Sequence, residues 1–363
     1  MWTVVRVPVV SSFLVTGGAG FVGSTLAFAI RRRWPDSKVV ALDNLRRRGS
    51  ERNLPRLKDA GVEFFHGDVR NPEDLEGVAP ADFLLECSAE PSVEAGYEGG
   101  PRYVLNTNLF GTVNCLEYAR RHGSKVVFFS SSRVYPMAPL NAARYIEQPT
   151  RFEWTDGQVM AGVSSRGVTE TCSLVGARSF YGATKLASEM LCEEYAHAFD
   201  LGVVVNRCGV VAGPWQLGKI DQGILAFWVA RHHFGGALDY LGFGGAGKQL
   251  RDFLHAEDLA ELVLDQIQGF DGFRGQTFNV GGGPAASVSL CELTALCREA
   301  TGRAIPVGSR DGARRADLRI YVSDCSKLFR ATNWRPKHSV QQIVADIADW
   351  VREYEDTVRI LAG

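Results

Sequence analysis

Three features that mark specialised classes of protein are missing from this sequence. No run of 18 or more apolar residues follows the short N-terminal stretch, which Arg6 and Pro8 interrupt, so the sequence disfavours a membrane span and a secretory signal peptide. The 40 basic residues nearly balance the 41 acidic ones, which gives no electrostatic reason to expect nucleic acid or a membrane as partner. The eight cysteines form no C-x-x-C pair or zinc-like cluster, so we expect reduced thiols, no metal site and a cytoplasmic location.

The first half of the 363-residue chain alternates short β-rich runs with amphipathic stretches of helical length, which is typical of βαβ units and a parallel sheet. After about residue 210, Gly-rich turns and separated helices replace this alternation. We therefore predict an α/β fold with a Rossmann-type doubly wound parallel sheet and a smaller C-terminal α/β lobe. The predicted strands are 13–16, 38–43, 62–66, 82–87, 125–130 and 203–207, and the predicted helices are 22–33, 101–122, 181–199, 289–301 and 340–354.

The same patterns predict two domains. Residues 1–210 are expected to form a cofactor-binding domain, and residues 211–363 to form mainly a substrate-binding lobe, segments of which can return to the main sheet. The stretch 136–179 is poorly periodic and rich in Arg, Gly and Ser. We expect it to form an irregular excursion over the site.

A glycine-rich segment joins the first predicted strand to the first predicted helix with a G-x-x-G-x-x-G pattern. Glycine allows a tight turn and a close approach to a pyrophosphate, while free N–H groups at the helix start attract the anion. Asp43 ends the next strand, 20 residues after Gly23, where a carboxylate can accept hydrogen bonds from both ribose hydroxyls. These features predict a dinucleotide site formed by Gly17, Gly20, Phe21, Val22, Gly23 and Asp43.

The residues after Asp43 bear on the choice of dinucleotide. A carboxylate here repels the 2′-phosphate of NADP and favours NAD. Arg46, Arg47 and Arg48 form a basic cluster that can host that phosphate, or can be a solvated loop that meets the adenosine face. We expect NAD because of Asp43.

Four further residues belong to the predicted cofactor site. Asn44 and Arg46 directly follow the Asp43 strand, and Asp68 and Val69 follow the third strand, where they are placed to contact adenine. Asp68 can equally cap the segment after Pro72.

Two segments supply candidate catalytic groups. The strand KVVFF delivers Ser131 at its carboxyl end, where open α/β sheets bind ligands. Tyr181 and Lys185 lie four residues apart at the start of a predicted helix, so the phenol and the ammonium share one helix face. An adjacent ammonium and a positive nicotinamide ring favour phenolate, which can remove a hydroxyl proton. The serine hydroxyl would orient the substrate oxygen.

The sequence resembles the extended short-chain dehydrogenase/reductases, specifically the nucleotide-sugar epimerases and dehydratases. The resemblance implies NAD-dependent chemistry with Ser131 as the catalytic hydroxyl, Tyr181 as the base and Lys185 as its partner, which also contacts the cofactor. The resemblance assigns Asn108 to the cofactor site. The alternative is that Asn108 makes local hydrogen bonds and has no contact with the cofactor. The matching segments span nearly the whole chain and include TGGAGFVGS, LDN, GDVRN, NTNLFGT, SSSRVY, YGATK, NRCGVVAGPWQ, KQLRDFLHAEDLA and NVGGG.

Within this family the chain is most similar to epimerases that invert C2 of a CDP-linked deoxyhexose, through RSFYGATKLASE, RCGVVAGPWQLGKIDQG, WVARHHF and GKQLRDFLHAEDL. The 4,6-dehydratases of the family carry an Asp-Glu pair after the catalytic hydroxyl residue, and here those positions are Ser132 and Arg133. Without these carboxylates, elimination lacks its proton donor.

The resemblance also implies which residues bind a nucleotide-sugar substrate. Arg251 and Arg314 match positions that bind the diphosphate or nucleotide, and Gln249 lies near Arg251 in the sequence. Arg133 is assigned to the same substrate site. Surface solvation, or pairing with neighbouring aspartates, is the alternative for the arginines. Two other functions stay open, a UDP-hexose 4-epimerase and a non-catalytic nucleotide-binding regulator. The family commonly pairs subunits through two helices, which implies a homodimer or homotetramer built on 101–122 and 181–199.

Overall fold

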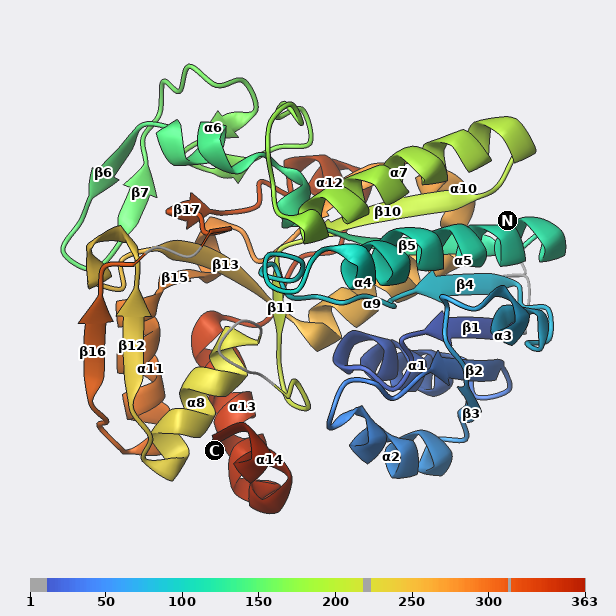
Figure 1. The fold of residues 1–363 in the computed structure, drawn as a ribbon, viewed down its shortest axis with the longest axis horizontal. Coiled ribbons are helices and arrows are strands. Elements are labelled where there is room, and N and C mark those ends of the chain that lie inside the picture. The colour runs from blue at the N-terminus through green and yellow to red at the C-terminus, as the bar shows by residue number, and fades with distance from the viewer. Residues whose placement is uncertain (1–11, 218–222, 313–314, 363) are drawn as a thin grey trace, which may run out of the picture.

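A seven-stranded parallel sheet is the largest sheet of the described structure and lies on the right in Figure 1. The computed structural model describes residues 12–217, 223–312 and 315–362, with side chains up to residue 359. The strand order is β14-β10-β5-β4-β1-β2-β3. The chain enters the sheet at the interior strand β1, adds β2 and β3 on one side, and then adds β4, β5, β10 and β14 on the other. This order confirms the predicted doubly wound α/β fold. The strands are β1 (Ser12–Thr16), β2 (Lys38–Asp43), β3 (Glu63–His66), β4 (Phe83–Glu86), β5 (Lys125–Ser131), β10 (Val203–Cys208) and β14 (Thr277–Val280).

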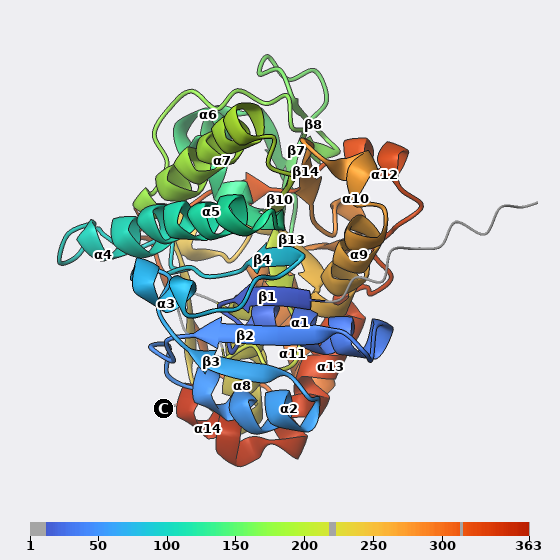
Figure 2. The same cartoon turned by 90° about the vertical axis from the view of Figure 1, so that its right-hand side faces the viewer.

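Helices cover both faces of this sheet (Figure 2). Successive side chains of a strand point to opposite faces, so Phe13 and Val15 of β1 enter one core while Leu14 enters the other. The first core includes residues of α1 (Phe21–Arg33), α2 (Leu54–Asp59), α9 (Ala256–Gln268), α10 (Phe270–Phe273) and α12 (Ser326–Ala331). The second includes residues of α3 (Pro72–Glu76), α5 (Gly111–His122) and α7 (Phe180–Phe199). The chain after residue 210 therefore contributes β14, α9, α10 and α12 to the main sheet and its cover.

The predicted helix 101–122 is present and contains a π-helical segment. It runs as α4 (Arg102–Leu105), the π-helix η2 (Asn106–Phe110) and α5 without a break in helical backbone angles at the junctions. Single π turns inside α-helices often occur at functional sites. Here the π turn contains Asn108, one of the residues predicted for the site.

The C-terminal lobe packs four helices against small sheets. Its core joins α8 (Ile224–Phe234), α11 (Leu290–Thr301), α13 (Val340–Glu353) and α14 (Glu355–Ala362). A four-stranded sheet consists of β11 (Val210–Ala212), β13 (Leu250–His255), β15 (Ser287–Ser289) and β17 (Ile320–Tyr321), and β12 (Leu238–Leu241) pairs with β16 (Val307–Arg310). Among the described residues, no helix combines the length and apolarity needed to cross a bilayer.

The segment 136–179 has more regular structure than expected. It contains α6 (Met137–Ala142) and two hairpins, β6 (Tyr145–Glu147) with β7 (Phe152–Trp154) and β8 (Val163–Ser164) with β9 (Gly167–Val168). Strands of two or three residues are too short to give a periodic pattern, so the sequence did not reveal them. Its apolar side chains share one core with Leu250 of β13 and with Ile320 and Tyr321 of β17.

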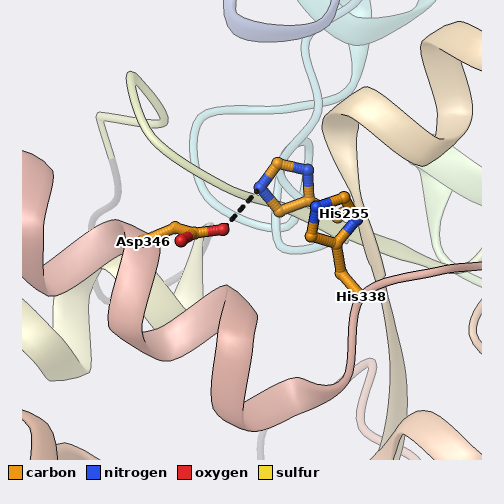
Figure 3. A group of neighbouring side chains, drawn as sticks. All are labelled: His255, His338 and Asp346. Atoms are coloured by element: carbon orange, nitrogen blue, oxygen red, sulfur yellow. Dashed lines mark ion pairs between the residues drawn. The ribbon is translucent and has the colours of Figure 1, made fainter.

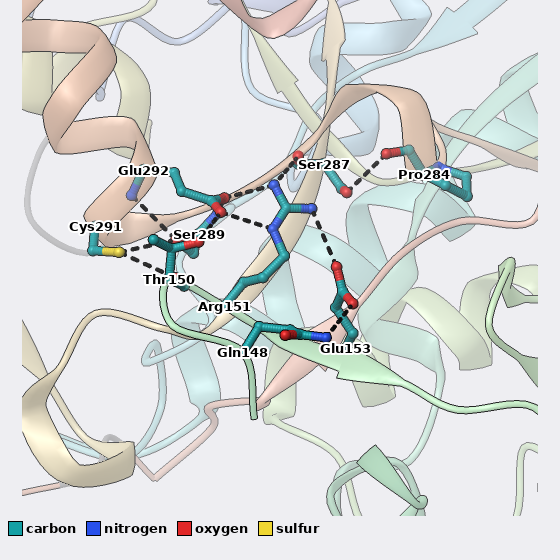
Figure 4. A network of polar contacts seen from close by, with 9 residues as sticks. All are labelled: Gln148, Thr150, Arg151, Glu153, Pro284, Ser287, Ser289, Cys291 and Glu292. Atoms are coloured by element: carbon teal, nitrogen blue, oxygen red, sulfur yellow. Dashed lines mark hydrogen bonds and ion pairs between the residues drawn. The ribbon is translucent and has the colours of Figure 1, made fainter. Parts of the chain in front are cut away.

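An ion pair fastens this segment to the C-terminal lobe (Figure 4). The guanidinium of Arg151 donates to both carboxylate oxygens of Glu292, at 2.8 and 2.6 Å. Glu292 also completes the capping box at the start of α11, where Ser289 is the N-cap residue. One carboxylate therefore joins the helix start to the loop between β6 and β7.

Candidate active site

A cavity of about 1060 Å³ opens at the carboxyl ends of the central strands and extends to the C-terminal lobe. Its lining brings together the glycine turn, Asp43, Ser131, Tyr181 and Lys185. Ligands bind at this edge in open parallel sheets, because the strand order reverses there. The arrangement joins the predicted cofactor and catalytic residues in one continuous space.

The glycine turn has the geometry that a pyrophosphate site needs. Gly17 has a left-handed φ of 63°, and a Cβ on Gly23 would lie 2.2 Å from the carbonyl oxygen of Gly17. No side chain caps α1, and its first turn contains no acidic residue. Phe21, Val22 and Gly23 of that turn line the cavity, so their backbone N–H groups are available to an anion. These residues fit the pyrophosphate of a dinucleotide.

Asp43 lies at the end of β2 and lines the same cavity. Its carboxylate accepts the backbone N–H groups of Ala19 (3.2 Å) and Leu45 (2.8 Å), which fixes its orientation beside the glycine turn. Burial raises the pKa of Asp43, and these hydrogen bonds oppose that rise. Of the arginines that follow, Arg46 lies 4.3 Å from the ring centre of Tyr103, and Arg47 donates a hydrogen bond to the carbonyl of Leu217 at 2.9 Å.

Asn44 and Asp68 contact each other through a 2.8 Å hydrogen bond between their side chains. Asp68 also pairs with Arg70 at 2.5 Å. Burial alone would raise the pKa of Asp68, but the hydrogen bonds from Arg70 and Asn44 lower it to about 2. Asn71 is the N-cap residue of α3, so the alternative that Asp68 caps this helix is wrong. Asn44 and Val69 line the cavity, whereas Asp68 supports them from behind.

The start of α7 packs closely on the end of β5. Ser179 caps the helix by accepting the N–H of Gly182 at 3.1 Å. A Cβ on Gly182 would lie 2.1 Å from the carbonyl oxygen of Arg133, so glycine permits this approach. Ser131 is 8% exposed, and its hydroxyl accepts the N–H of Arg133 at 3.2 Å. This packing explains why Tyr181 lines the cavity together with Ser131.

The side chain of Asn108 bonds to the main chain and does not line the cavity. Its side chain accepts the N–H of Glu90 (2.7 Å) and donates to the carbonyl of Glu90 (3.1 Å). The Asn108 side chain is fully buried, whereas the segment from Cys87 to Pro91 lines the cavity. Asn108 therefore makes local hydrogen bonds, which was the alternative to a cofactor contact. These two hydrogen bonds hold the cavity wall in place.

A buried network that sequence reasoning missed supports the end of β5. Glu189 on α7 accepts two hydrogen bonds from Arg207, at 3.1 and 2.7 Å, and another from the hydroxyl of Ser130. Arg207 also donates to the phenol of Tyr135, which donates to Asn279. The paired carboxylate holds Arg207 charged despite its burial. Only the spacing of Glu189, one helical turn after Lys185, offered a sequence signal.

The predicted substrate residues line the far end of the cavity. Arg133 donates to the carbonyl of Ala316 (3.1 Å), and Gln249 donates to the carbonyl of Leu241 (3.0 Å). Arg251 forms an ion pair with Asp317 at 2.8 Å. In this structure Arg251 therefore pairs with a neighbouring aspartate, which was the alternative to phosphate binding. Burial lowers the pKa of Arg251 to about 10. Arg314 lies outside the described residues.

Two histidines and an aspartate form a separate cluster (Figure 3). The rings of His255 and His338 stack at 4.2 Å, and Nε2 of His255 lies 3.6 Å from a carboxylate oxygen of Asp346. Nδ1 of His255 accepts the N–H of Glu257 at 3.0 Å, so in the neutral ring Nε2 carries the hydrogen. A metal ligand needs a free lone pair there. With that hydrogen in place, Nε2 of His255 offers no lone pair to a cation.

Comparisons with known proteins agree with this geometry. Residues 13–281 match the sequence profile described as the NAD dependent epimerase/dehydratase family. The chain is 31% identical to the CDP-paratose 2-epimerase of Salmonella typhi, over 93% of this chain and 98% of the relative. It is similar to the NAD complex of Thermus thermophilus UDP-glucose 4-epimerase (26% identity, TM-score 0.75, 94% and 99% coverage). It is also similar to a dTDP-glucose 4,6-dehydratase of Streptomyces venezuelae with NAD bound (27% identity, TM-score 0.78, 96% and 99% coverage).

Proposed function

Because the chain belongs to the NAD-dependent epimerase/dehydratase family, we propose that it is a nucleotide-sugar epimerase that inverts C2 of a CDP-linked deoxyhexose, as in the conversion of CDP-paratose to CDP-tyvelose. Its cofactor is NAD. The observation that carries the proposal is the common cavity in which Tyr181, Lys185 and Ser131 line the wall beside the glycine turn. The 31% identity with a CDP-paratose 2-epimerase supports the choice of sugar and carbon.

Bound NAD supplies a hydride acceptor that can return the same hydride. Tyr181 removes the proton of the sugar hydroxyl, because the Lys185 ammonium on the same helix face stabilises the phenolate. Ser131 donates a hydrogen bond that orients the same oxygen. Inversion would require the keto sugar to turn in the cavity and present its opposite face, and Tyr181 would return the proton to the sugar oxygen. The net redox change is zero, so the cofactor can stay bound.

The residues after Ser131 favour epimerisation over dehydration. Ser132 and Arg133 line the cavity, and neither side chain is a carboxylic acid that can protonate a leaving hydroxyl. Arg133, Gln249 and Arg251 would bind the substrate diphosphate or nucleotide, with Arg314 assigned the same role by resemblance alone. Arginine suits this role because its planar donors match phosphate oxygens.

Turnover of CDP-paratose and UDP-galactose, measured side by side on the NAD-loaded protein, tests the proposal. We expect conversion of the CDP-sugar. Conversion of UDP-galactose alone would make the protein a UDP-hexose 4-epimerase, a reaction that the similarity to the Thermus enzyme supports. No turnover of any nucleotide sugar would favour the non-catalytic regulator, although both Tyr181 and Lys185 are present.

We extend the proposal to domains, assembly and location. Residues 1–210 would serve the cofactor and residues 211–363 mainly the substrate. A homodimer or homotetramer would form through the helices at 101–122 and 181–199, since Phe110, Met190 and Phe199 on them are more than half exposed and apolar. The eight unpaired cysteines are consistent with a reducing cytoplasmic location.

A further inference from the structure

A buried carboxylate that the mechanism above does not use lies next to the catalytic lysine. Glu86 is the last residue of β4, and its side chain is 1% exposed. Its Oε2 atom lies 3.7 Å from Nζ of Lys185, whose side chain is 3% exposed. Two opposite charges therefore meet where both side chains are almost inaccessible to solvent; Lys185 lines the cavity, whereas Glu86 does not.

Lys185 is the charged group that Glu86 faces. Neither carboxylate oxygen has a hydrogen-bond partner within normal distance among the described residues. Burial raises the pKa of Glu86, and the Lys185 ammonium, followed by the backbone N–H of Ser88, opposes that rise. The strands beside Glu86 contribute Thr16 and Phe128 in register. The titratable neighbours are thiols, those of Cys87 after the strand, Cys115 on α5 and Cys192 on α7, and burial raises the pKa of each thiol and keeps it neutral.

The charge of Lys185 is in turn compensated by the Glu86 carboxylate. Nζ of Lys185 lies 4.7 Å from the ring centre of Phe128, which attracts an ammonium but carries no negative charge to neutralise it. Moving an ammonium out of water is unfavourable unless an anion compensates its charge. Within the described part of the chain, Glu86 is the anion that forms an ion pair with Lys185.

We propose that Glu86 is the counter-ion that keeps Lys185 protonated and holds its ammonium on the cavity side of α7. Glu86 acts through Lys185 and is a positioning residue rather than a catalytic one. The inference rests on the role of Lys185 in the proposed function. The negative charge of Glu86 therefore sets how strongly the Lys185 ammonium acts on Tyr181.

The electrostatic consequence has a defined sign. Without the negative charge of Glu86, Lys185 loses its proton at lower pH, because burial then opposes its charge without compensation. While it remains charged, the uncompensated ammonium stabilises the Tyr181 phenolate more strongly. Both groups therefore titrate at lower pH. If Glu86 only stabilised the fold, its replacement would reduce activity without shifting the titration of Lys185 or of Tyr181.

Glu86→Gln and Glu86→Asp test this directly on NAD-loaded protein. The Lys185 resonance is followed by NMR of protein labelled with 15N at the lysine side chains and is assigned by its absence in Lys185→Met. We expect the Lys185 titration to move down by about one pH unit or more in E86Q and to stay near the wild-type value in E86D, which keeps the charge. Equal titration in all three proteins would overturn the proposal.

This readout needs no turnover, so it separates the inference from the proposed function. A shifted lysine in a protein that converts no nucleotide sugar would uphold the counter-ion and refute the epimerase. With turnover, E86Q should also move both limbs of the kcat–pH profile to lower pH. A uniform loss of kcat with unmoved limbs would contradict the proposal.

A reciprocal experiment covers the case in which E86Q fails to fold. Lys185→Met leaves Glu86 in place without its counter-ion, so the buried carboxylate should take up a proton. Infrared difference spectra of this variant should gain a C=O band of a protonated carboxylic acid that the wild-type protein lacks. Absence of that band in folded K185M, or its presence in the wild type, would refute the ion pair.

Discussion

The side chain of Asn108 makes two hydrogen bonds to the main chain of Glu90, one as acceptor and one as donor. The π-helical segment η2 thereby fixes the segment after β4, which forms one wall of the cavity. Replacing Asn108 with Ala should remove both bonds and cost about 1–3 kcal/mol of unfolding free energy. It should also lower kcat, because the wall loses its support.

Urea denaturation and turnover of the same samples measure both effects. Asn114→Ala is the matched control, since Asn114 lies on α5 and donates a hydrogen bond to the carbonyl of Val69 on another wall. We expect the control to lose about 1 kcal/mol and to keep more of its activity. Equal kcat in the two variants would show that Asn108 does not support catalysis.

Tyr181→Phe removes the proposed base while preserving the ring. We expect kcat to fall by about 100-fold or more, the usual contribution of a general base. Bound NAD should be retained, because the glycine turn and Asp43 remain intact. The control is Tyr195→Phe at the far end of α7, whose hydroxyl bonds to Glu117. Near-normal turnover by the Tyr181 variant would rule out this base.

Gly23→Ala tests the cofactor turn. The added Cβ would lie 2.2 Å from the carbonyl oxygen of Gly17, so the turn must shift at a cost of about 1–3 kcal/mol. NAD binding, measured by calorimetry on cofactor-free protein, should weaken accordingly. Gly272→Ala, where a Cβ meets open space, should bind NAD as the wild type does. Unchanged affinity in Gly23→Ala would place the pyrophosphate elsewhere.

His255 should make the fold sensitive to acid. Burial, followed by the nearby His338, lowers the pKa of His255 below its usual value in the folded protein. The unfolded chain therefore takes up this proton first as the pH falls below about 6.5. Stability is full above that pH and is lost as the pH falls toward the folded pKa.

His255→Asn keeps a side-chain acceptor at the N-cap of α9 and removes the titration. Its free energy of unfolding should fall less between pH 7 and pH 5 than that of the wild type. The control His197→Asn changes an exposed histidine and should leave the acid response unchanged. An identical pH dependence in the wild type and His255→Asn would contradict this account.

Local patterns in the sequence predicted much of the fold and the centre of the site. The glycine turn, Asp43 and Ser131 could be found because each lies at the end of a predicted strand, and parallel strands bring those ends to one edge. Tyr181 and Lys185 could be found because one helix fixes their relation. The wall contact of Asn108 and the pairing of Glu86 with Lys185 could not, because each joins segments that only tertiary folding brings together. The hairpins in 136–179 were missed because their strands are too short for periodicity.

Reversible oxidation of one sugar carbon is the central claim, and label retention tests it most directly. CDP-paratose carrying deuterium at C2 is incubated with the NAD-loaded protein, and NMR follows the configuration and the label at that carbon. The account predicts inversion at C2 with the deuterium retained, because the same hydride leaves and returns while the cofactor stays bound. Recovery of CDP-paratose with C2 uninverted, or inversion with the label exchanged for solvent hydrogen, would contradict it.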